Sequence, residues 1–363
     1  MAVTRAFTNA TNFEKRKTAH PLIINGDMAV AQRGTVTGIT SPGTYGGPDR
    51  TRADIRGGFT VQVAQSTTVP SGYGFENSAK LDVTTADASP DANGLLLLVY
   101  SFEGQDLQCL KYGTSSAETV TIAFWIRSNK TGTFQVNLRM VEAYHIGQLV
   151  TISSADTWEK KVITFVGNTS NAMANDNSNE LRIQFFFDAG SDNEGGGVPS
   201  SWAAVNEAKS YNGTLDLGDN TANEVLITGL QMEVGEFNSD TIPEFQFESH
   251  AENLARCQRY FYKTFDQGTT PAQNVSDGNY LLAVGTDTGS RSHGSIEFPV
   301  AMRADPTITT FNPFAANASA RQPNSTTDVA FQATTPREHS CGCSFTNTSV
   351  GSYHIHITAA AEL

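Results

Sequence analysis

Residues 227–262 read ITGLQMEVGEFNSDTIPEFQFESHAENLARCQRYFY, a strand pattern that leads into the one clear helix pattern of the chain. Alternate positions from Leu230 to Val234 are apolar, which is typical of a half-buried β-strand, and Gly229 just before them indicates a bulge. Pro243 ends the strand pattern. We therefore predict that an all-β domain closes here and that a second unit follows.

The helix pattern begins at a capping box. The Ser249 hydroxyl can accept a hydrogen bond from an orphan amide of the first turn, while the Glu252 carboxylate reaches back to the cap. Cys257 and Phe261 follow at helical spacing. The pattern predicts a linking helix over residues 249–262, and a helix this short is stable in water only when it packs on something.

The sequence before this stretch, residues 21–248, consists of short strand patterns separated by Gly, Ser, Asn and Asp clusters. Two strands are particularly clear, and their inward-facing residues are predicted to be Val120, Ile122, Phe124 and Ile126 in the first and Leu181, Ile183, Phe185 and Phe187 in the second. Regular short strands without a fixed repeat predict an all-β fold, a jelly-roll β-sandwich.

The sequence after it, residues 263–363, predicts a smaller C-terminal β-domain. Its candidate strands are residues 280–284, 295–300, 307–311, 329–332 and 353–358. A sheet this modest protects its own edges poorly, and pairing with copies of itself would cover them. We expect this unit to be distal.

Composition restricts the function. The chain of 363 residues is long enough for two domains, and its formal net charge of −13 argues against nucleic-acid binding. It contains no run of 18 apolar residues and no apolar signal-peptide region near the N-terminus, so we expect neither membrane insertion nor export by the general route. Four cysteines in this length do not make a disulfide scaffold.

Residues 1–20 differ from the rest because they are basic, with four Lys and Arg against one Glu, and they contain two phenylalanines. One interpretation is a disordered tail. The other is an attachment arm that another protein holds in place.

Several short motifs resemble those of phage tail-fibre and virion-appendage proteins with a carbohydrate-binding-like jelly-roll domain. They are LIINGDM (22–28), AQRG (31–34), VPSGYG (69–74), TTADAS (84–89), FEGQDLQ (102–108), SSADTWEKK (153–161), ITGLQMEVG (227–235), ARCQRYF (255–261), FPVAMRADP (298–306) and the closing AEL (361–363). Singly none of these motifs is specific, but together they are, and the resemblance covers residues 21–363.

The resemblance implies a phage tail fibre for host attachment, a homotrimer whose jelly roll recognises a host cell-surface glycan without catalysis. Residues 1–20 would attach it to other tail or baseplate proteins, and it would be located in the virion after assembly in the host cytoplasm. The competing interpretation is a capsid-decorating or connector protein with no receptor role.

Sugar binding needs an exposed aromatic face for stacking together with planar amides and carboxylates for the hydroxyls. Long loops on rigid sheets often carry such groups, and residues 190–213 form a long loop rich in Gly, Ser and Asn. The candidate ligand-binding residues are Trp202, Tyr211, Asp192, Asn193 and, more weakly, Tyr73. The alternative for Trp202 is that its ring packs the loop onto the sandwich.

Three metal hypotheses are weaker than their structural alternatives, so we predict no cofactor and no metal. Asn25, Asp27 and Glu233 could meet as oxygen ligands of a structural calcium. His354 and His356 share a strand face, and a trimer would gather six imidazoles; the alternative is a polar outer face. The third hypothesis is zinc at His339, Cys341 and Cys343, whose spacing fits two buried thiols better.

Catalysis has no sequence signature in this chain. There is no Gly-x-Ser-x-Gly elbow, no His-Glu-x-x-His and no phosphate loop. Carboxylates are abundant, but a glycosidase pair is defined by a separation that the sequence does not give. We expect a protein that is not an enzyme.

Overall fold

The computed structural model describes residues 18, 20–141, 143–278, 280–285, 289, 291–323, 325–348 and 350–363, with side chains left out at 280–285. The chain divides into two compact units, which meet in the sequence between Glu248 and Ser249. Residues 32–34 belong to the second unit and Leu363 to the first. Most of the predicted attachment arm, residues 1–17 and 19, lies outside the described residues.

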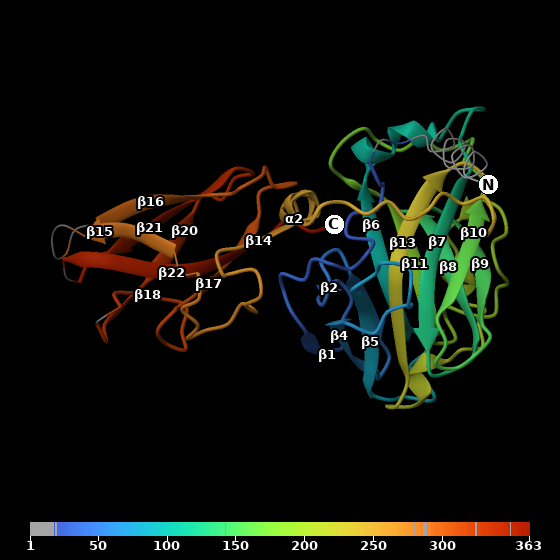
Figure 1. Ribbon diagram of the computed structural model, residues 1–363, viewed down its shortest axis with the longest axis horizontal. Coiled ribbons are helices and arrows are strands. Elements are labelled where there is room, and N and C mark those ends of the chain that lie inside the picture. The colour runs from blue at the N-terminus through green and yellow to red at the C-terminus, as the bar shows by residue number, and fades with distance from the viewer. Residues whose placement is uncertain are drawn as a thin grey trace. The chain divides into compact units, whose positions relative to one another are not determined.

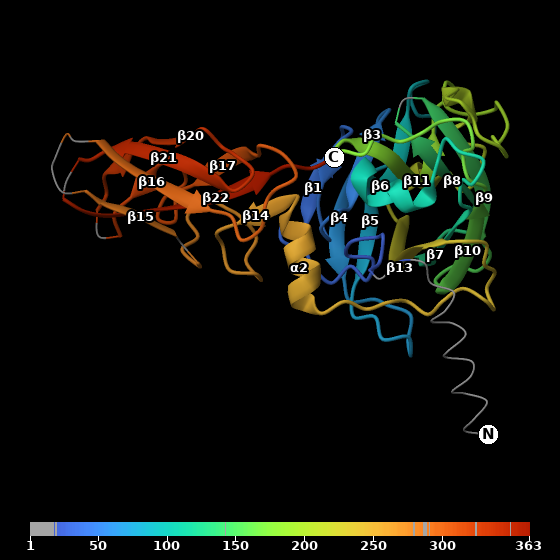
Figure 2. The ribbon, with the colours of Figure 1, turned by 90° about the horizontal axis from the view of Figure 1, so that it is seen from above.

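The first unit is a sandwich of two antiparallel sheets (Figure 1). The six-stranded sheet has the order β1 (Val36–Ile39), β4 (Thr60–Ser66), β5 (Ser78–Thr85), β13 (Glu224–Val234), β7 (Val120–Ser128), β10 (Glu159–Phe165). The seven-stranded sheet has the order β12 (Ala203–Ala204), β9 (Tyr144–Ile152), β8 (Gly132–Met140), β11 (Asn179–Ala189), β6 (Leu95–Glu103), β3 (Arg52–Arg56), β2 (Thr44–Tyr45). The two sheets appear as separate layers in Figure 2. The predicted all-β jelly-roll sandwich is confirmed.

The core of this unit lies between the sheets. All eight residues that were predicted to face inward on β7 and β11 are buried. The Phe124 ring of β7 meets the Phe185 ring of β11 edge-on, with 5.1 Å between centroids, and the Phe134 ring of β8 lies 6.4 Å away. Burying one such ring stabilises the fold by about 2–3 kcal/mol, so this aromatic contact holds the two sheets together.

Strand β13 carries the predicted bulge. Its register with β7 shifts between Thr228 and Gln231, and Gly229 has φ +60°. A Cβ at Gly229 would lie 2.6 Å from the Phe75 ring, so this position needs glycine for space as well as for backbone conformation. The prediction that this strand is half-buried is wrong. All but its first residue are buried, because residues around Phe75 and Pro243 cover the outward side.

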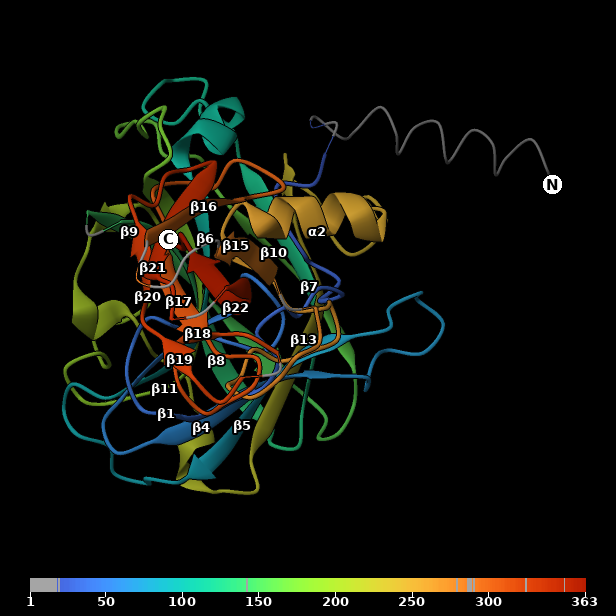
Figure 3. The same cartoon turned by 90° about the vertical axis from the view of Figure 1, so that its left-hand side faces the viewer.

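The second unit is built around the long strand β22 (Gly351–Ala360), which pairs with four others, β14 (Phe261–Lys263), β15 (Tyr280–Gly285), β17 (Thr307–Phe311) and β18 (Ala320–Arg321). Strand β18 also pairs with β19 (Asp328–Val329). A separate three-stranded sheet contains β16 (Arg291–Glu297), β21 (Ser340–Thr346) and β20 (Phe331–Thr334). Figure 3 shows β22 beside β17 and β18. Strand β21 was not predicted, because its Ser-Cys-Gly-Cys-Ser run lacks bulky apolar residues.

Helix α2 (His250–Gln258) begins at the predicted capping box. The Ser249 side chain accepts a hydrogen bond from the Glu252 amide, and the Glu252 carboxylate accepts one from the Ser249 amide. The helix ends at Gln258, four residues before the predicted end at residue 262. Phe261 instead lies in β14, where it pairs with Ala360, so the backbone after Gln258 forms sheet hydrogen bonds instead of helical ones.

Three short 3₁₀ helices, η1 (Gly104–Leu110), η2 (Glu207–Lys209) and η3 (Leu217–Asp219), lie in loops of the first unit. Across the described residues, no helix combines the length and the apolarity that crossing a bilayer would require.

Candidate functional site: a groove on the seven-stranded sheet

The outward face of the seven-stranded sheet is polar along three of its strands. Because side chains alternate along a strand, the residues between the inward-facing ones all point to this face. They are Arg52, Asp54 and Arg56 of β3, Arg182, Gln184 and Phe186 of β11, and Gln135, Asn137 and Arg139 of β8. Strand β6 lies between β3 and β11 and contributes apolar residues to the same face. Pairing of the strands therefore brings guanidinium, carboxylate and amide groups together around an apolar strip.

Most of these residues, but not Gln135 and Asn137, line a groove of about 480 Å³. This volume lies within the range of ligand sites in proteins. The lining residues are Pro42, Arg52, Asp54, Arg56, Asn93, Leu95, Leu97, Arg139, Arg182, Gln184, Phe186, Asp192, Asn193 and Glu207. The apolar part of its lining is well packed, since Leu97 and Phe186 form a buried cluster with Tyr211 of the loop 190–213. The groove is thus preformed, with polar groups on a rigid sheet.

Two arginines of the groove are fixed by carboxylates. Arg52 donates from Nε and from its terminal nitrogen to the two oxygens of Asp54, at 2.8 and 2.6 Å. Arg139, whose side chain is 8% exposed, donates to both oxygens of Glu207 at 3.1 and 2.9 Å. Partial burial opposes ionisation of Glu207, but the hydrogen bonds and charge of Arg139 outweigh it and lower the pKa of this carboxyl. Bidentate pairs of this kind fix the geometry of both partners.

Other polar side chains of the groove have no such partner. Within the described residues, the side chains of Arg56, Gln184 and Asp192 make no hydrogen bond or ion pair with the protein. Gln184 is the most enclosed of them, at 6% exposure. A buried amide that lacks a protein partner needs water or a ligand to complete its hydrogen bonds. These groups are therefore available to bind.

One wall of the groove is the long loop 190–213, which buried amides hold against β8. Gln135 and Asn137 donate to the carbonyl oxygens of Lys209 and Ser210 at 2.8 and 2.9 Å. Asn212 donates back to the Gln135 side chain at 3.2 Å. Each bond contributes about 1 kcal/mol, and together they fix the loop that supplies Asp192, Asn193 and Glu207 to the groove.

The candidate residues from the sequence fall into two groups. Asp192 and Asn193 line the groove, with Asp192 exposed and Asn193 bound to the Gly94 carbonyl oxygen at 3.1 Å. The ring of Tyr211 is only 1% exposed, and its hydroxyl bonds to Phe187 and Asp216, so Tyr211 presents no surface to a ligand. It supports the base of the groove instead.

Trp202 lies away from the groove. Its indole nitrogen donates to the Val166 carbonyl oxygen at 2.7 Å, and its ring meets the Tyr112 ring edge-on with 5.7 Å between centroids. These contacts correspond to the alternative in which the ring packs its loop onto the sandwich. Tyr73 lies on the six-stranded sheet, 4.3 Å from the Trp125 ring and 56% exposed. The structure does not bring Trp202, Tyr211 and Tyr73 together.

The residues that the sequence interpretation missed are the arginines and Gln184. They come from separate strands, so no local motif contains them. The signal was the alternation itself: once Leu181, Ile183 and Phe185 face inward, Arg182 and Gln184 must face outward. A search of the outward positions for planar polar side chains would have found them.

The metal hypotheses find no support in the geometry. The Asn25 amide is used by the backbone of a neighbouring loop, through Val30 and Asp49. In the described part of the chain, no three His, Cys, Asp or Glu residues are arranged to hold a metal ion. Cys341 and Cys343 are buried free thiols.

The alternative for the histidine pair, a polar outer face, is wrong for His356. This residue is 0% exposed, its ring stacks on Phe265 with 3.8 Å between centroids, and its Nδ1 lies 3.0 Å from the Thr264 hydroxyl. Burial lowers the pKa of His356 to about 4, so it packs as a neutral ring.

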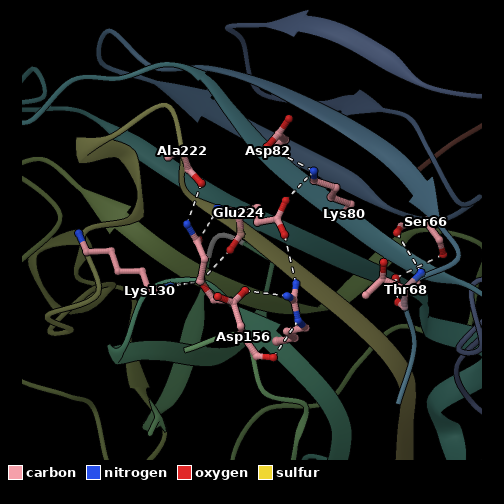
Figure 4. Close-up of polar contacts among 12 residues, drawn as sticks. Ser66, Thr68, Lys80, Asp82, Lys130, Asp156, Ala222 and Glu224 are labelled. Carbon is pink, nitrogen blue, oxygen red and sulfur yellow. Dashed lines mark hydrogen bonds and ion pairs between the residues drawn. The ribbon is translucent and has the colours of Figure 1, made fainter. Parts of the chain in front are cut away.

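The outward face of the six-stranded sheet also carries charged residues, but these pair with one another (Figure 4). Glu224 of β13 accepts from Lys80 at 2.6 Å and from Arg127 at 3.2 Å. Arg127 also bonds to Asp156 at 2.6 Å, and a separate pair joins Lys130 to Asp219 at 2.7 Å. The network is complete within the protein and leaves none of these cations for a ligand.

No family model matches the chain, and no curated protein matches it in sequence. Solved structures do.

The enzymatically active domain of tailspike protein 4 of bacteriophage CBA120 is 9% identical with a TM-score of 0.30, over 59% of this chain and 21% of that one. A putative sugar binding protein from Bacteroides thetaiotaomicron is 13% identical with a TM-score of 0.33, over 59% and 100%. A family 11 carbohydrate-binding module from Clostridium thermocellum, in complex with a β-1,3-1,4-mixed-linked tetrasaccharide, is 12% identical with a TM-score of 0.28, over 58% and 99%.

Proposed function

We propose that this chain is a non-catalytic glycan-binding protein that attaches a phage tail fibre to its host, and that the groove on the seven-stranded sheet holds the glycan. The observation that carries the proposal is the set of unpartnered polar side chains, Arg56, Gln184 and Asp192, in a preformed groove of about 480 Å³. Sugars present rows of hydroxyls, and planar amide, carboxylate and guanidinium groups on rigid strands recognise such rows.

The fixed parts of the groove favour recognition of an extended ligand. Its residues come from β3, β6, β11 and β8, so the groove crosses several strands. Neighbouring strands lie about 4.8 Å apart, which gives a span of roughly 14 Å across these four. A span of this size accommodates several units of a chain in place of a single sugar.

The location on a virion rests on the sequence motifs of residues 21–363 that resemble tail-fibre proteins. In this proposal residues 1–20 join the chain to tail or baseplate proteins, and three copies form the fibre. Weak single-site binding then becomes firm attachment, because engaging several linked sites raises the overall affinity by about 10²–10⁴-fold.

Two features of the groove support a role without catalysis. A glycosidase needs a carboxyl group with a raised pKa as its acid. Glu207 instead accepts paired hydrogen bonds from Arg139, which help to lower the pKa of its carboxyl, and Asp54 is held in a similar pair by Arg52. The carboxyl whose pKa burial raises to about 7 is Asp188, which is 4% exposed and does not line the groove.

Binding to an array of bacterial surface polysaccharides tests the proposal. Gln184→Ala removes a groove amide, and Gln62→Ala makes the same change at an outward position of β4 on the other sheet. We expect the wild type and the Gln62 variant to bind the same glycans, and the Gln184 variant to lose at least fivefold in affinity. If no glycan binds, or if the two variants lose affinity equally, the groove is not the receptor site.

The competing proposal, a capsid-decorating or connector protein, predicts no glycan binding at all. The solution mass, measured by light scattering with and without residues 1–20, provides a separate test. A trimer that survives loss of the arm supports a fibre, and a monomer in both forms supports a decoration protein that is ordered by its neighbours.

A further inference from the structure

The charge of the groove differs from that of the chain as a whole. The chain has 24 Lys and Arg against 37 Asp and Glu. The groove is lined by four arginines against three acidic residues. The cations are all arginine, whose planar fork binds carboxylate, sulfate and phosphate groups through two parallel hydrogen bonds. The groove is therefore slightly basic and lined by arginines, although the protein as a whole is acidic.

The ion pairs inside the groove leave a small excess of positive charge, because two of its four arginines pair with two of its three acids and Asp192 is the one acid that remains. Asp54 is bound by Arg52 and Glu207 by Arg139, so these two acids are neutralised by the protein itself. Arg56 is exposed and makes no ion pair or hydrogen bond with any described residue. An arginine that has no partner within the protein, next to arginines that do, can bind an anionic group of a ligand.

A second arginine stands toward the other end of the groove. Arg56 lies opposite Leu95 on β6, whereas Arg182 lies opposite Ser101 on the same strand. Six residues of extended strand separate these positions, which is about 20 Å. Gln184 and Phe186 occupy the β11 positions between them. The spacing suits a chain that carries acidic groups at intervals, with neutral hydroxyls between.

We propose that the ligand of this groove is an acidic polysaccharide, held by its carboxylate or sulfate groups at Arg56 and Arg182 and by its hydroxyls at Gln184. This inference rests on the proposed glycan-binding function and adds the chemical class of the glycan. The net charge of −13 opposes non-specific binding of a polyanion, so its binding depends on local cationic sites such as the arginines of the groove.

The test is calorimetric titration of the full chain with matched pairs of polymers. Polygalacturonate, alginate and hyaluronate are each compared with their carboxyl-reduced forms, and dextran sulfate is compared with dextran. We expect at least one acidic polymer to bind, with a loss of tenfold or more when its carboxyl or sulfate groups are removed. Comparing the affinities for the carboxylate polymers and for dextran sulfate shows whether the arginines prefer carboxylate or sulfate groups.

Paired variants assign the effect to the groove. Arg56→Gln should weaken binding of the acidic polymer about tenfold, and Arg56→Lys should restore only part of the loss, because a lysine cannot form the bidentate pair. Arg127→Gln makes the same change on the six-stranded sheet and should leave affinity unchanged. Thermal melting of each variant checks that it is folded.

Two outcomes overturn the inference and are distinct from each other. If neutral or reduced polymers bind as tightly as their acidic forms, and Arg56→Gln has no effect, the glycan-binding function stands but the acidic ligand is wrong. If neither acidic nor neutral polymers bind, the glycan-binding function fails together with the inference.

Discussion

The two outward faces of the same sandwich use charged residues in opposite ways. On the six-stranded sheet, Lys80, Arg127 and Glu224 form a continuous set of ion pairs across three strands. On the seven-stranded sheet, Arg56 and Gln184 lie in a groove with no partner among the described residues. Both faces follow from alternating strands of similar composition.

The difference lies in whether the protein itself satisfies the polar groups. A surface network of paired charges contributes modestly to stability, and it has little left to offer a ligand. Polar groups that the fold holds rigid but leaves unpaired lose hydrogen bonds unless water or a ligand completes them. A ligand-binding face is therefore recognised by its unsatisfied groups, and the number of charges on it is a poor guide.

The largest effect is expected where the groove depends on a buried charge. Glu207→Ala leaves the guanidinium of Arg139, 8% exposed, without its carboxylate. Because Glu207 is itself half-exposed, we expect a loss below the usual ~3–5 kcal/mol for a buried pair, about 2–3 kcal/mol in the free energy of unfolding. The same change loosens the loop wall, so glycan affinity should fall as well. Urea unfolding and glycan titration measure the two effects. An unchanged stability would show that this pair does not hold the wall.

The second largest effect is a pH dependence of the free energy of unfolding. It comes from Asp188, which lies on β11 with Gln184. Burial raises the pKa of Asp188 to about 7, from an ordinary value near 4. Between these values the folded state keeps a proton that the unfolded state has lost. The free energy of unfolding therefore falls as pH rises toward 7, by up to ~1.4 kcal/mol per pH unit.

Asp188→Asn should remove this dependence of the free energy of unfolding on pH, and the variant should be more stable than wild type at pH 8. His356 in the second unit has the opposite sign, because its lowered pKa makes stability fall as pH drops from about 6.5 to about 4. The difference between wild type and the Asn variant cancels that contribution. Equal slopes in urea unfolding at pH 4.5, 6 and 8 would contradict the buried-carboxyl account.

A smaller effect is expected for a groove variant that changes ligand affinity without changing stability. Asp192→Asn removes an exposed, unpaired carboxylate from the groove rim and keeps its shape. We expect stability to stay within about 0.5 kcal/mol, as for most surface changes. Affinity for an acidic polymer should rise about twofold to fivefold, because a like charge is removed. A loss of affinity would mean that Asp192 binds hydroxyls directly.

The smallest effect on glycan binding is predicted for a variant of the six-stranded sheet. Arg127→Gln breaks partly exposed pairs with Glu224 and Asp156, which should cost about 0.5–1 kcal/mol at low salt and less at high salt. Glycan affinity should not change. If this variant binds more weakly than wild type, the two faces are not separate in function.

The sequence predicted the features that depend on local pattern. The sandwich, the bulge at Gly229 and the capping box at Ser249 all follow from alternation, backbone freedom and side-chain reach within a few residues. The local pattern did not predict where the helix ends. Phe261 keeps helical spacing, but it pairs in a sheet with Ala360, which is 99 positions later. A contact that distant has no local signal.

The site was predicted only in part for the same reason. Asp192 and Asn193 were found because they lie in a conspicuous loop. Arg56, Gln184 and Glu207 come from two strands and a loop that only sheet pairing and packing bring together. Trp202 and Tyr211 were chosen as aromatic residues in that loop, but the sequence does not show which rings find a packing partner. Tyr211 finds one at the base of the groove.

The most direct test of the central claim is the affinity of two double variants for one bound polysaccharide, measured by titration. Arg56→Gln with Gln184→Ala changes the groove, and Arg127→Gln with Gln62→Ala makes the same two substitutions on the opposite face. We predict that the first loses at least fiftyfold in affinity and that the second binds within twofold of wild type. The reverse order, or equal losses, would place the glycan elsewhere and contradict the assignment of the groove.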